Sequence, residues 1–287
     1  MTSIRKELAE YGLTPRKRWG QHFLVDRNIL NKIVQTAQIG KEDTVLEVGP
    51  GLGEMTLALA RQARNVIAVE IDPKLVGILR NKTATSTNVE IIGKDILKVD
   101  FREIADREGR SIKVVANLPY QISTPLLFRF IEEREVFSTL TVMVQREVAE
   151  RMVAPPGGKD YGPLSIFVQL FSELSIRFFV KPSAFFPPPN VDSAVIQMTW
   201  KERPTVGLED EEWFRRVVRG CLGYRRKTLI NALKHSGLVL PEDAEGRMEE
   251  VGIDSHRRPE TLAIEEFATL AKVLKSPEFP LSLGGKG

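Results

Sequence analysis

The chain has 287 residues and a net charge of only +3, with 42% apolar and 28% charged residues, as expected for a globular protein with one large and one small domain. Its single cysteine, Cys221, excludes an internal disulfide and argues against a Cys-ligated metal site, and three scattered histidines add no metal motif. Since no run of about eighteen apolar residues exists and the N-terminus lacks a secretory apolar core, we expect a cytoplasmic, metal-free protein that binds no membrane.

The first segment is a polar, basic arm. Arg16, Lys17 and Arg18 stand directly before the aromatic stretch 19–24, and such a combination can bind nucleic acid through phosphate contacts and stacking. The alternative is a solvated arm whose aromatic side chains pack on the core. A helix over 29–37, capped by Asp26, is predicted to follow.

A strand, a glycine turn and a helix come next, over 44–48, 49–53 and 55–61. This unit presents backbone N–H groups to a ligand, and glycines let that ligand approach the backbone closely. It is not the dinucleotide fingerprint, which would need glycine where Glu54 stands. An acid there disfavours a pyrophosphate, so a nucleoside without phosphate fits better.

Two further strands, over 65–71 and 89–92, end close to the acids Glu70 and Asp95. The carboxyl ends of parallel strands share one edge of a sheet, so both acids should line the same crevice as Gly49. Glu70 is placed to accept ribose hydroxyls, and Asp95 to accept an exocyclic amine. Together they favour S-adenosylmethionine over NAD, whereas the alternative is a structural turn with ordinary loop acids or helix caps.

The fourth strand, over 113–116, ends in Asn117-Leu118-Pro119-Tyr120. The exocyclic amine of adenine or cytosine is a poor nucleophile, because its lone pair is delocalised into the ring. The side-chain oxygen of Asn117 and the backbone oxygen of Leu118 can accept its hydrogens, Pro119 fixes the turn, and Tyr120 offers a stacking face for an extruded base. The alternative is a plain strand-ending turn with a buried tyrosine.

A closing antiparallel pair of strands is predicted over 176–180 and 195–200. The stiff, proline-rich loop 185–193 between them can hold an aromatic ring over a pocket. We predict that Phe185 forms the second face of the base sandwich, and that Phe186 is the better candidate for a buried plug. Helices are predicted between the strands, over 125–135, 146–153 and 164–171.

From about residue 202 the strands stop and helices follow. The predicted fold is α/β: a Rossmann-like sheet, mostly parallel with an antiparallel last strand, over 1–202, and a small all-helical domain over 203–287. Arg225, Arg226 and Lys227 are predicted to begin a helix of this domain and to contact an RNA backbone. A charge run is more often a solvated face, which is the alternative.

Taken in order, these motifs make the chain resemble the small-subunit ribosomal RNA adenine N6,N6-dimethyltransferases from about residue 16 to 274. Each motif alone is weak or moderate, but the ordered set is highly specific. They are Gly20-Gln21-His22-Phe23-Leu24, Glu47-Val48-Gly49-Pro50-Gly51, Asn117-Leu118-Pro119-Tyr120, Val144-Gln145-Arg146-Glu147-Val148-Ala149, Phe185-x-Pro187-x-Pro189-x-Val191-Asp192-Ser193 and Arg225-Arg226-Lys227-Thr228-Leu229.

The resemblance implies a class I methyltransferase that uses S-adenosylmethionine and no metal. Its substrate would be two adjacent adenosines in the 3′-terminal hairpin of 16S rRNA, methylated late in assembly of the small ribosomal subunit. His22 sits where many relatives have asparagine. The residues implied to bind the cofactor are His22, Leu24, Gly49, Glu70, Asp95 and Asn117.

Two other functions remain open. One is the related large-subunit rRNA adenine methyltransferase of macrolide resistance, whose fourth-strand motif typically has Ile where this chain has Leu118. The other is a non-catalytic RNA-binding assembly or transcription factor on the same fold. Leu118 and the segment 225–229 argue against the large-subunit enzyme. The intact residues Gly49, Glu70, Asp95 and Asn117 argue against a non-catalytic factor. We expect a monomer.

Overall fold

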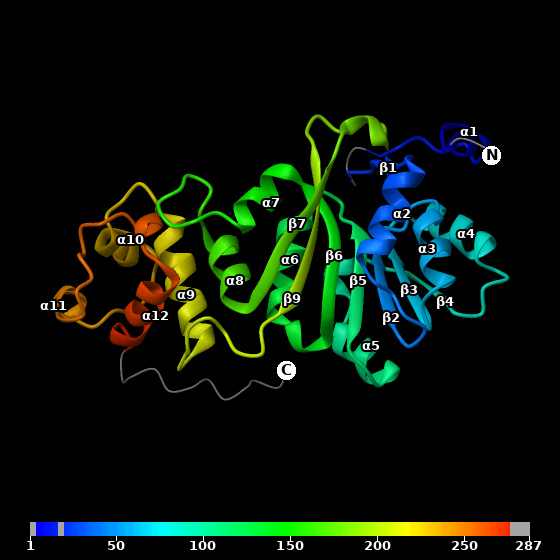
Figure 1. Cartoon of the computed structure of the whole chain (residues 1–287). Coiled ribbons are helices and arrows are strands. Elements are labelled where there is room, and N and C mark those ends of the chain that lie inside the picture. The colour runs from blue at the N-terminus through cyan, green and yellow to red at the C-terminus, as the bar shows by residue number, and fades with distance from the viewer. Residues whose placement is uncertain (1–3, 17–19, 276–287) are drawn as a thin grey trace. The chain divides into compact units, whose positions relative to one another are not determined.

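The computed structural model describes residues 4–16 and 20–275 (Figure 1). Contacts within the chain divide it into two compact units. The first comprises the described residues up to Glu150 together with Ser172–Trp200, and the second comprises Arg151–Phe171 together with the described residues from Lys201 onward. The expected tail 276–287 lies outside the described ranges.

The first unit is built on one seven-stranded sheet with the order β4-β3-β2-β5-β6-β9-β7. The five strands β2 to β6 are parallel, and β9 is antiparallel to both of its neighbours, β6 and β7. This confirms the mostly parallel sheet with an antiparallel last strand. The strands are Thr44–Val48 (β2), Asn65–Glu70 (β3), Val89–Gly93 (β4), Ile112–Asn117 (β5), Phe137–Gln145 (β6), Ser172–Val180 (β7) and Ser193–Trp200 (β9).

Helices flank the sheet and bury apolar side chains on it. Leu30 and Ile33 of α2 and Leu59 of α3 pack in one apolar cluster with Val45 of β2 and Val115 of β5. The helices of this unit are Ile4–Glu10 (α1), Arg27–Thr36 (α2), Glu54–Ala60 (α3), Pro73–Lys82 (α4), Phe101–Glu108 (α5), Ser123–Glu132 (α6) and Arg146–Met152 (α7), which extends two residues into the second unit. None of the helices in the described ranges combines the length and apolar character of a membrane span.

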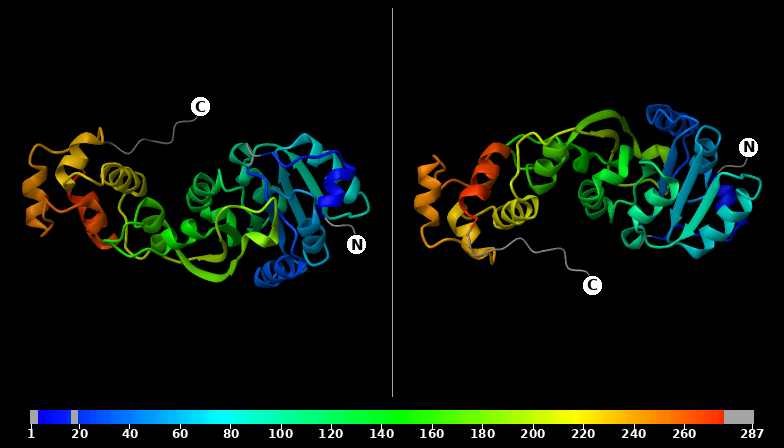
Figure 2. Two further views of the ribbon diagram at one scale, coloured as in Figure 1. Left: turned by 90° about the horizontal axis from the view of Figure 1, so that it is seen from above. Right: turned by 90° about the horizontal axis from the view of Figure 1, so that it is seen from below.

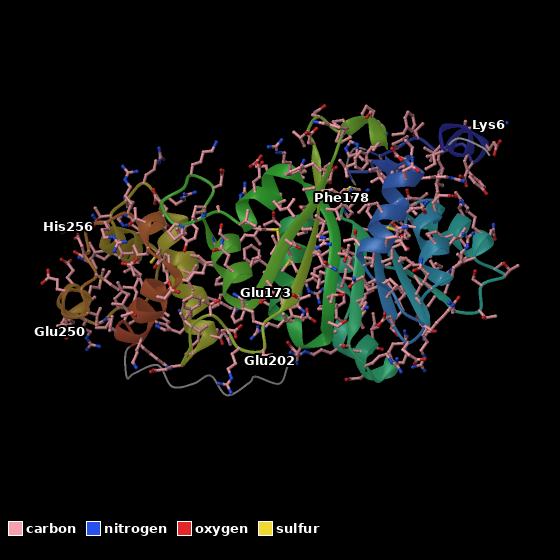
Figure 3. All side chains as sticks on the ribbon, in the orientation of Figure 1. Lys6, Glu173, Phe178, Glu202, Glu250 and His256 are labelled. Atoms are coloured by element: carbon pink, nitrogen blue, oxygen red, sulfur yellow. The ribbon has the colours of Figure 1, made fainter. Side chains whose placement is uncertain are left out.

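Helix α2 also contacts β7, an edge strand of the sheet. Lys32 Nζ lies 4.1 Å from the ring centroid of Phe178 in β7, which is labelled in Figure 3. At the start of α2, Asp26 Oδ1 accepts hydrogen bonds from the backbone N–H groups of Asn28 and Ile29, as predicted for a capping residue.

The elements of this unit that were not predicted include two short strands and the helices α1 and α5. The two-residue strands β1 (Phe23–Leu24) and β8 (Phe185–Phe186) pair in antiparallel fashion. Helix α1 docks on the unit through Leu8, which is 2% exposed and packs in a cluster with Phe23 and Leu75. A short helix with one inward-facing leucine gives too little periodicity for prediction, so the sequence suggested only a polar arm.

The second unit is helical, as predicted for the C-terminal region. Its helices, drawn from green to red in Figure 2, are Pro163–Phe171 (α8), Glu211–Gly223 (α9), Leu229–His235 (α10), Ala244–Glu250 (α11) and Ile264–Val273 (α12). The predicted boundary at 202–203 had placed 151–171 in the first domain. These residues group with the second unit because α8 packs on α9, where the rings of Phe167 and Phe214 make an edge contact at 6.2 Å.

Candidate active site

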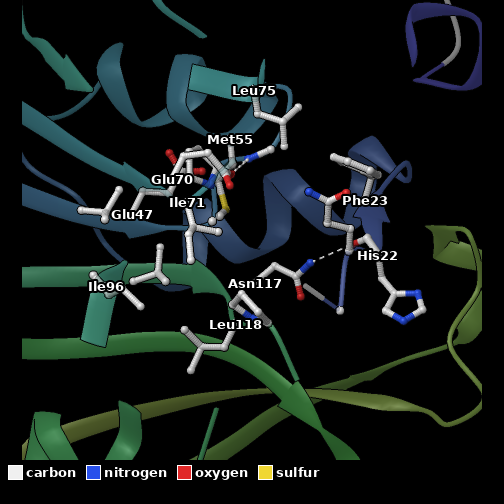
Figure 4. Close-up of a pocket in the computed structure, with 18 of the residues that line it drawn as sticks. His22, Phe23, Glu47, Met55, Glu70, Ile71, Leu75, Ile96, Asn117 and Leu118 are labelled. Atoms are coloured by element: carbon white, nitrogen blue, oxygen red, sulfur yellow. Dashed lines mark hydrogen bonds between the residues drawn. The ribbon is translucent and has the colours of Figure 1, made fainter. Parts of the chain in front are cut away.

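A cavity of about 220 Å³ opens at the carboxyl-end edge of the parallel strands (Figure 4). Its walls come from the segment before α2, the glycine turn and the ends of β2, β3 and β5. The structure brings together at this cavity most of the residues that the sequence singled out: His22, Leu24, Gly49, Glu70, Asp95, Asn117, Leu118, Pro119 and Tyr120.

The glycine turn after β2 requires its glycines for conformation and for space. Gly49 and Gly51 have positive φ angles of 64° and 59°. A Cβ atom on Gly51 would lie 3.1 Å from the Phe23 ring, and one on Gly49 would lie 3.4 Å from Pro119 Cγ. These glycines therefore let the N-terminal segment and the Asn117–Tyr120 motif close on the turn.

Glu70, at the end of β3, supports this turn. Its Oε2 accepts a hydrogen bond of 3.3 Å from Gly51 N–H, and its Oε1 accepts one of 2.9 Å from Asp72 N–H. Burial raises the pKa of Glu70 above its ordinary value, while these two backbone bonds oppose the rise. A carboxylate oxygen can accept more than one hydrogen bond, so Glu70 keeps acceptor capacity toward the cavity.

Asp95, which follows β4, combines two roles that the sequence left as alternatives. Its Oδ1 accepts a hydrogen bond of 3.0 Å from Leu97 N–H and so caps a short 3-10 turn, Ile96–Lys98. Its other carboxylate oxygen makes no hydrogen bond with any described residue, and the side chain lines the cavity. Capping therefore holds Asp95 in place and leaves one oxygen available to a ligand.

Asn117 ends β5 and crosses to the N-terminal segment. Its Nδ2 donates a hydrogen bond of 3.1 Å to the backbone oxygen of His22, drawn as a dashed line in Figure 4. Its Oδ1 is buried and has no hydrogen-bond partner among the described residues. The next residue, Leu118, is anchored by a hydrogen bond of 3.0 Å from its N–H to Met143 O. An unused, desolvated acceptor is thus fixed at the cavity wall.

Tyr120 is held from two sides. Its hydroxyl and the Ser193 hydroxyl are 2.5 Å apart, and the His22 ring stacks on the Tyr120 ring with centroids 5.5 Å apart and planes 27° apart. Burial raises the pKa of Tyr120, with the Ser193 bond opposing. His22 Nδ1 lies 2.7 Å from the backbone oxygen of Pro187 and must donate the proton, because a carbonyl only accepts. The role of Ser193, 0% exposed, was missed from the sequence although its motif was noted.

Phe185 does not reach this cavity, which differs from the prediction of a second stacking face. It is 3% exposed and packs in the apolar cluster that contains Leu30 and Val195. Phe186 instead packs on the cluster that contains Phe23. Neighbouring residues of a strand face opposite sides, and pairing with β1 turns Phe185 toward the core. The ring that fills the apolar core is therefore that of Phe185, whereas the prediction had assigned this place to Phe186.

Glu47 is a further residue of the cavity wall that received no role from the sequence. It is 0% exposed, and neither of its carboxylate oxygens makes a hydrogen bond with a described residue. Burial raises its pKa to about 8, and the nearby Glu70 carboxylate adds to the rise. An acid inside an otherwise apolar strand was the signal that could have revealed it.

The predicted RNA-binding residues fall in different settings. Arg16 lies beside the cavity rim, with Nη1 3.8 Å from Asp72 Oδ2, whereas Lys17 and Arg18 lie outside the described residues. Arg225, Arg226 and Lys227 lie in the turn between α9 and α10, because α10 begins only at Leu229. The predicted helix start at these residues is therefore wrong.

Within this turn the two arginines differ. The guanidinium of Arg225 donates hydrogen bonds to the backbone oxygens of Lys159 at 2.8 Å and Gly158 at 3.2 Å. Arg226 is exposed, and its side chain makes no hydrogen bond with any described residue. Arg225 thus ties two loops of its own unit together, whereas Arg226 faces solvent.

Comparisons with known proteins agree with this geometry. The family model described as ribosomal RNA adenine dimethylase matches residues 12–276. A protein of Bacillus mycoides named ribosomal RNA small subunit methyltransferase A is 45% identical over 276 residues, which is 94% of each chain. A protein of the same name from Geobacter metallireducens is 44% identical over 277 residues, covering 96% of this chain and 98% of the relative.

Solved structures give the same answer for the fold. A dimethyladenosine transferase from Plasmodium falciparum has a TM-score of 0.72 at 29% identity, covering 87% of this chain and 96% of that one. The 23S rRNA methyltransferase ErmE has a TM-score of 0.63 at 26% identity, covering 88% and 99%. The family match over nearly the whole chain and the relatives at 44–45% identity lead to one conclusion: this chain belongs to the ribosomal RNA adenine dimethylase family.

Proposed function

We propose that the chain is an S-adenosylmethionine-dependent rRNA (adenine-N6,N6) dimethyltransferase. Its substrate is a pair of adjacent adenosines in the 3′-terminal hairpin of 16S rRNA, within a partly assembled small ribosomal subunit. One observation carries the proposal: Asn117 Oδ1 is buried without a partner at the cavity wall, in a motif that ends in Tyr120, on a chain of this family.

The residues at the cavity suit S-adenosylmethionine. The positive φ angles of Gly49 and Gly51 expose backbone at the turn, and the acids Glu70 and Asp95 each keep acceptor capacity for hydroxyl or amine hydrogens. A carboxyl-rich cavity also favours a cation over a phosphate-bearing cofactor. When bound, S-adenosylmethionine supplies an electrophilic methyl group on its sulfonium sulfur.

The chain's own residues then act on the target amine. Asn117 Oδ1 and the Leu118 backbone oxygen accept the two N6 hydrogens, which favours a pyramidal nitrogen whose lone pair points at the methyl group. The desolvated position of Asn117 strengthens this bond, and the amide needs no reorganisation because Nδ2 is already held by His22 O. Tyr120, fixed by Ser193, offers the stacking surface that offsets the cost of extruding the base, about a few kcal/mol.

The product nitrogen carries one proton too many after each transfer, and this proton leaves to solvent. Before the second methyl transfer, the same nitrogen carries one hydrogen instead of two. Either of the two acceptors can hold it, so the site can accommodate both steps. The basic residues Arg226 and Lys227 would bind the RNA backbone and so position the hairpin. We also infer that the enzyme is a monomer and that it acts in the cytoplasm, where the ribosomal substrate assembles.

The test uses S-adenosylmethionine with a labelled methyl group. The protein is incubated with small subunits that lack the modification and, separately, with protein-free large-subunit rRNA, and the labelled nucleoside is identified by mass spectrometry. We expect N6,N6-dimethyladenosine from the small subunits alone. Label only in large-subunit rRNA would indicate that the chain is instead a 23S rRNA methyltransferase, the activity in the name of ErmE. Binding to small subunits without any label would indicate a non-catalytic factor.

A further inference from the structure

The buried acid Glu47 has no part in the mechanism above, yet it lines the cofactor cavity. It belongs to the fully buried strand β2 and sits next to the glycine turn that the cofactor must contact. Both of its oxygens lack hydrogen-bond partners among the described residues. A charged carboxylate in that setting would be strongly destabilised, so the empty cavity favours the neutral acid.

Its neighbour Glu70 is in the opposite situation. Glu70 accepts backbone N–H bonds on both oxygens, and such bonds stabilise the charged form of a carboxylate. The two acids come from paired strands, since Glu47 lies opposite Ala68 and Glu70 ends the same strand β3 (Figure 4). Two adjacent carboxylates do not readily ionise together, so Glu70 holds the negative charge and Glu47 holds the proton.

A cation that enters the cavity changes this balance. A positive charge near two carboxyl groups in a desolvated site favours ionisation of the one that is still neutral. S-adenosylmethionine carries a sulfonium, whereas its product S-adenosylhomocysteine has a neutral thioether in the same position. The two ligands therefore differ in the charge that they bring to Glu47, although their shapes are nearly the same.

We propose that Glu47 is a charge sensor of the cofactor site, which rests on the function proposed above. In the empty cavity Glu47 is protonated. When S-adenosylmethionine binds, the O–H bond of the Glu47 carboxyl group breaks and the proton passes to solvent. The resulting carboxylate then balances the charge of the sulfonium. The spent product lacks that charge and leaves Glu47 protonated. The enzyme thereby binds the methyl donor in preference to its own product, and donor binding releases a proton.

Several other titratable groups can respond to a ligand and must be separated from Glu47. Glu70 of β3 faces it, as does the Thr56 hydroxyl of α3. The remaining titratable residues of the cavity wall are His22, Glu54, Lys94, Asp95 and Tyr120. A neutral isostere at Glu47 leaves all of these in place, so a difference between the two proteins reports Glu47 alone.

The experiment is isothermal titration calorimetry of the wild-type protein and Glu47→Gln in phosphate and in Tris, at one pH near neutrality. The difference in heat between buffers gives the number of protons released. With S-adenosylmethionine, we expect the wild type to release about one proton more than the variant, and with S-adenosylhomocysteine no difference. The preference for donor over product should fall about tenfold in Glu47→Gln.

Glu47→Asp, which restores a carboxyl group, should recover proton release. A wild-type measurement covers the case that the variants do not fold: because donor binding releases a proton, donor affinity should increase as the pH is raised toward neutrality, by up to about tenfold per pH unit, while product affinity stays level. Equal proton release in wild type and Glu47→Gln, or parallel pH profiles for donor and product, would overturn the charge sensor. Failure of the wild type to bind S-adenosylmethionine at all would instead overturn the proposed function.

Discussion

Asn117 donates a hydrogen bond of 3.1 Å from Nδ2 to the backbone oxygen of His22, and this bond determines which end of the amide faces the cavity. A carbonyl oxygen can only accept, so Nδ2 must point to His22 and Oδ1 must point away from it. The bond joins the end of β5 to the segment before α2. One contact thus orients the acceptor of the reaction and positions the wall where His22 stacks on Tyr120.

Replacement of Asn117 by alanine should slow methyl transfer by about 10²–10³-fold, because it removes one preorganised acceptor from a desolvated site. Binding of S-adenosylmethionine should weaken much less. The measurement is the single-turnover rate at saturating cofactor, with circular dichroism to confirm the fold. Asn117→Asp is the matched control: it keeps an acceptor oxygen but loses the bond to His22 O, so an intermediate rate is expected. A wild-type rate in Asn117→Ala would exclude this role.

The hydroxyl pair of Tyr120 and Ser193 should behave as one functional unit. Tyr120→Phe and Ser193→Ala each remove the same 2.5 Å bond and free the Tyr120 ring from its fixed orientation. We expect each to reduce the transfer rate several-fold and the double variant to be no slower than the worse single one. The coupling energy should be about 1 kcal/mol. Additive losses in this double-mutant cycle would show that the bond does not position the ring.

The parts of the site predicted correctly from the sequence are those governed by local pattern. The glycine turn at 49–53 is recognisable because glycines, an apolar strand and a helix occur in fixed succession. The acids Glu70 and Asp95 could be assigned to one cavity because parallel strands present their carboxyl ends at one edge. Both inferences need only the strand order and direction, which β-rich apolar segments reveal.

The parts that were missed depend on contacts between distant segments. The orientation of Phe185 is set by pairing with Leu24, in strands too short to show any periodicity. The bond from Arg225 to the Lys159 backbone joins residues that lie 66 positions apart. Glu47 was overlooked for another reason: an acid in a buried strand violates the pattern, and its meaning becomes visible only when its lack of partners is known.

Glu47 should also make the stability of the cofactor-free protein depend on pH. Its pKa is about 8 in the folded state against 4.5 as the ordinary value, so the folded protein holds one proton more than the unfolded chain between these values. The free energy of unfolding should therefore fall as pH rises through this window, by up to about 1.4 kcal/mol per pH unit from this group.

Denaturant unfolding of wild type and Glu47→Gln from mildly acidic to mildly basic pH tests this expectation without any ligand. In the variant, the free energy of unfolding should fall less steeply with rising pH. A constant change in that free energy caused by the amide would not alter this slope. Because only the slope is compared, a general loss of stability in Glu47→Gln cannot imitate the effect. Identical slopes in the two proteins would mean that Glu47 does not hold a proton in the folded state.

The neighbouring arginines of the turn after α9 should separate stability from RNA binding. Arg225→Ala removes the bonds to the backbone oxygens of Lys159 and Gly158 and should lower the free energy of unfolding by about 1–3 kcal/mol. Arg226→Ala removes an exposed charge without such bonds and should leave stability unchanged. Its effect should appear in binding to small subunits, where the slope of log affinity against log salt decreases by about one.

A charge-reversing double substitution would merge these two effects, so the single variants are required. Thermal unfolding and subunit binding across a salt series are measured on each, with Arg225→Lys as the control that keeps the charge but loses the two-pronged bond. Arg225→Lys should share the stability loss of Arg225→Ala and retain more of the binding. Equal stability losses for Arg225→Ala and Arg226→Ala would contradict the structural role of Arg225. An unchanged salt slope in Arg226→Ala would remove Arg226 from the RNA contact.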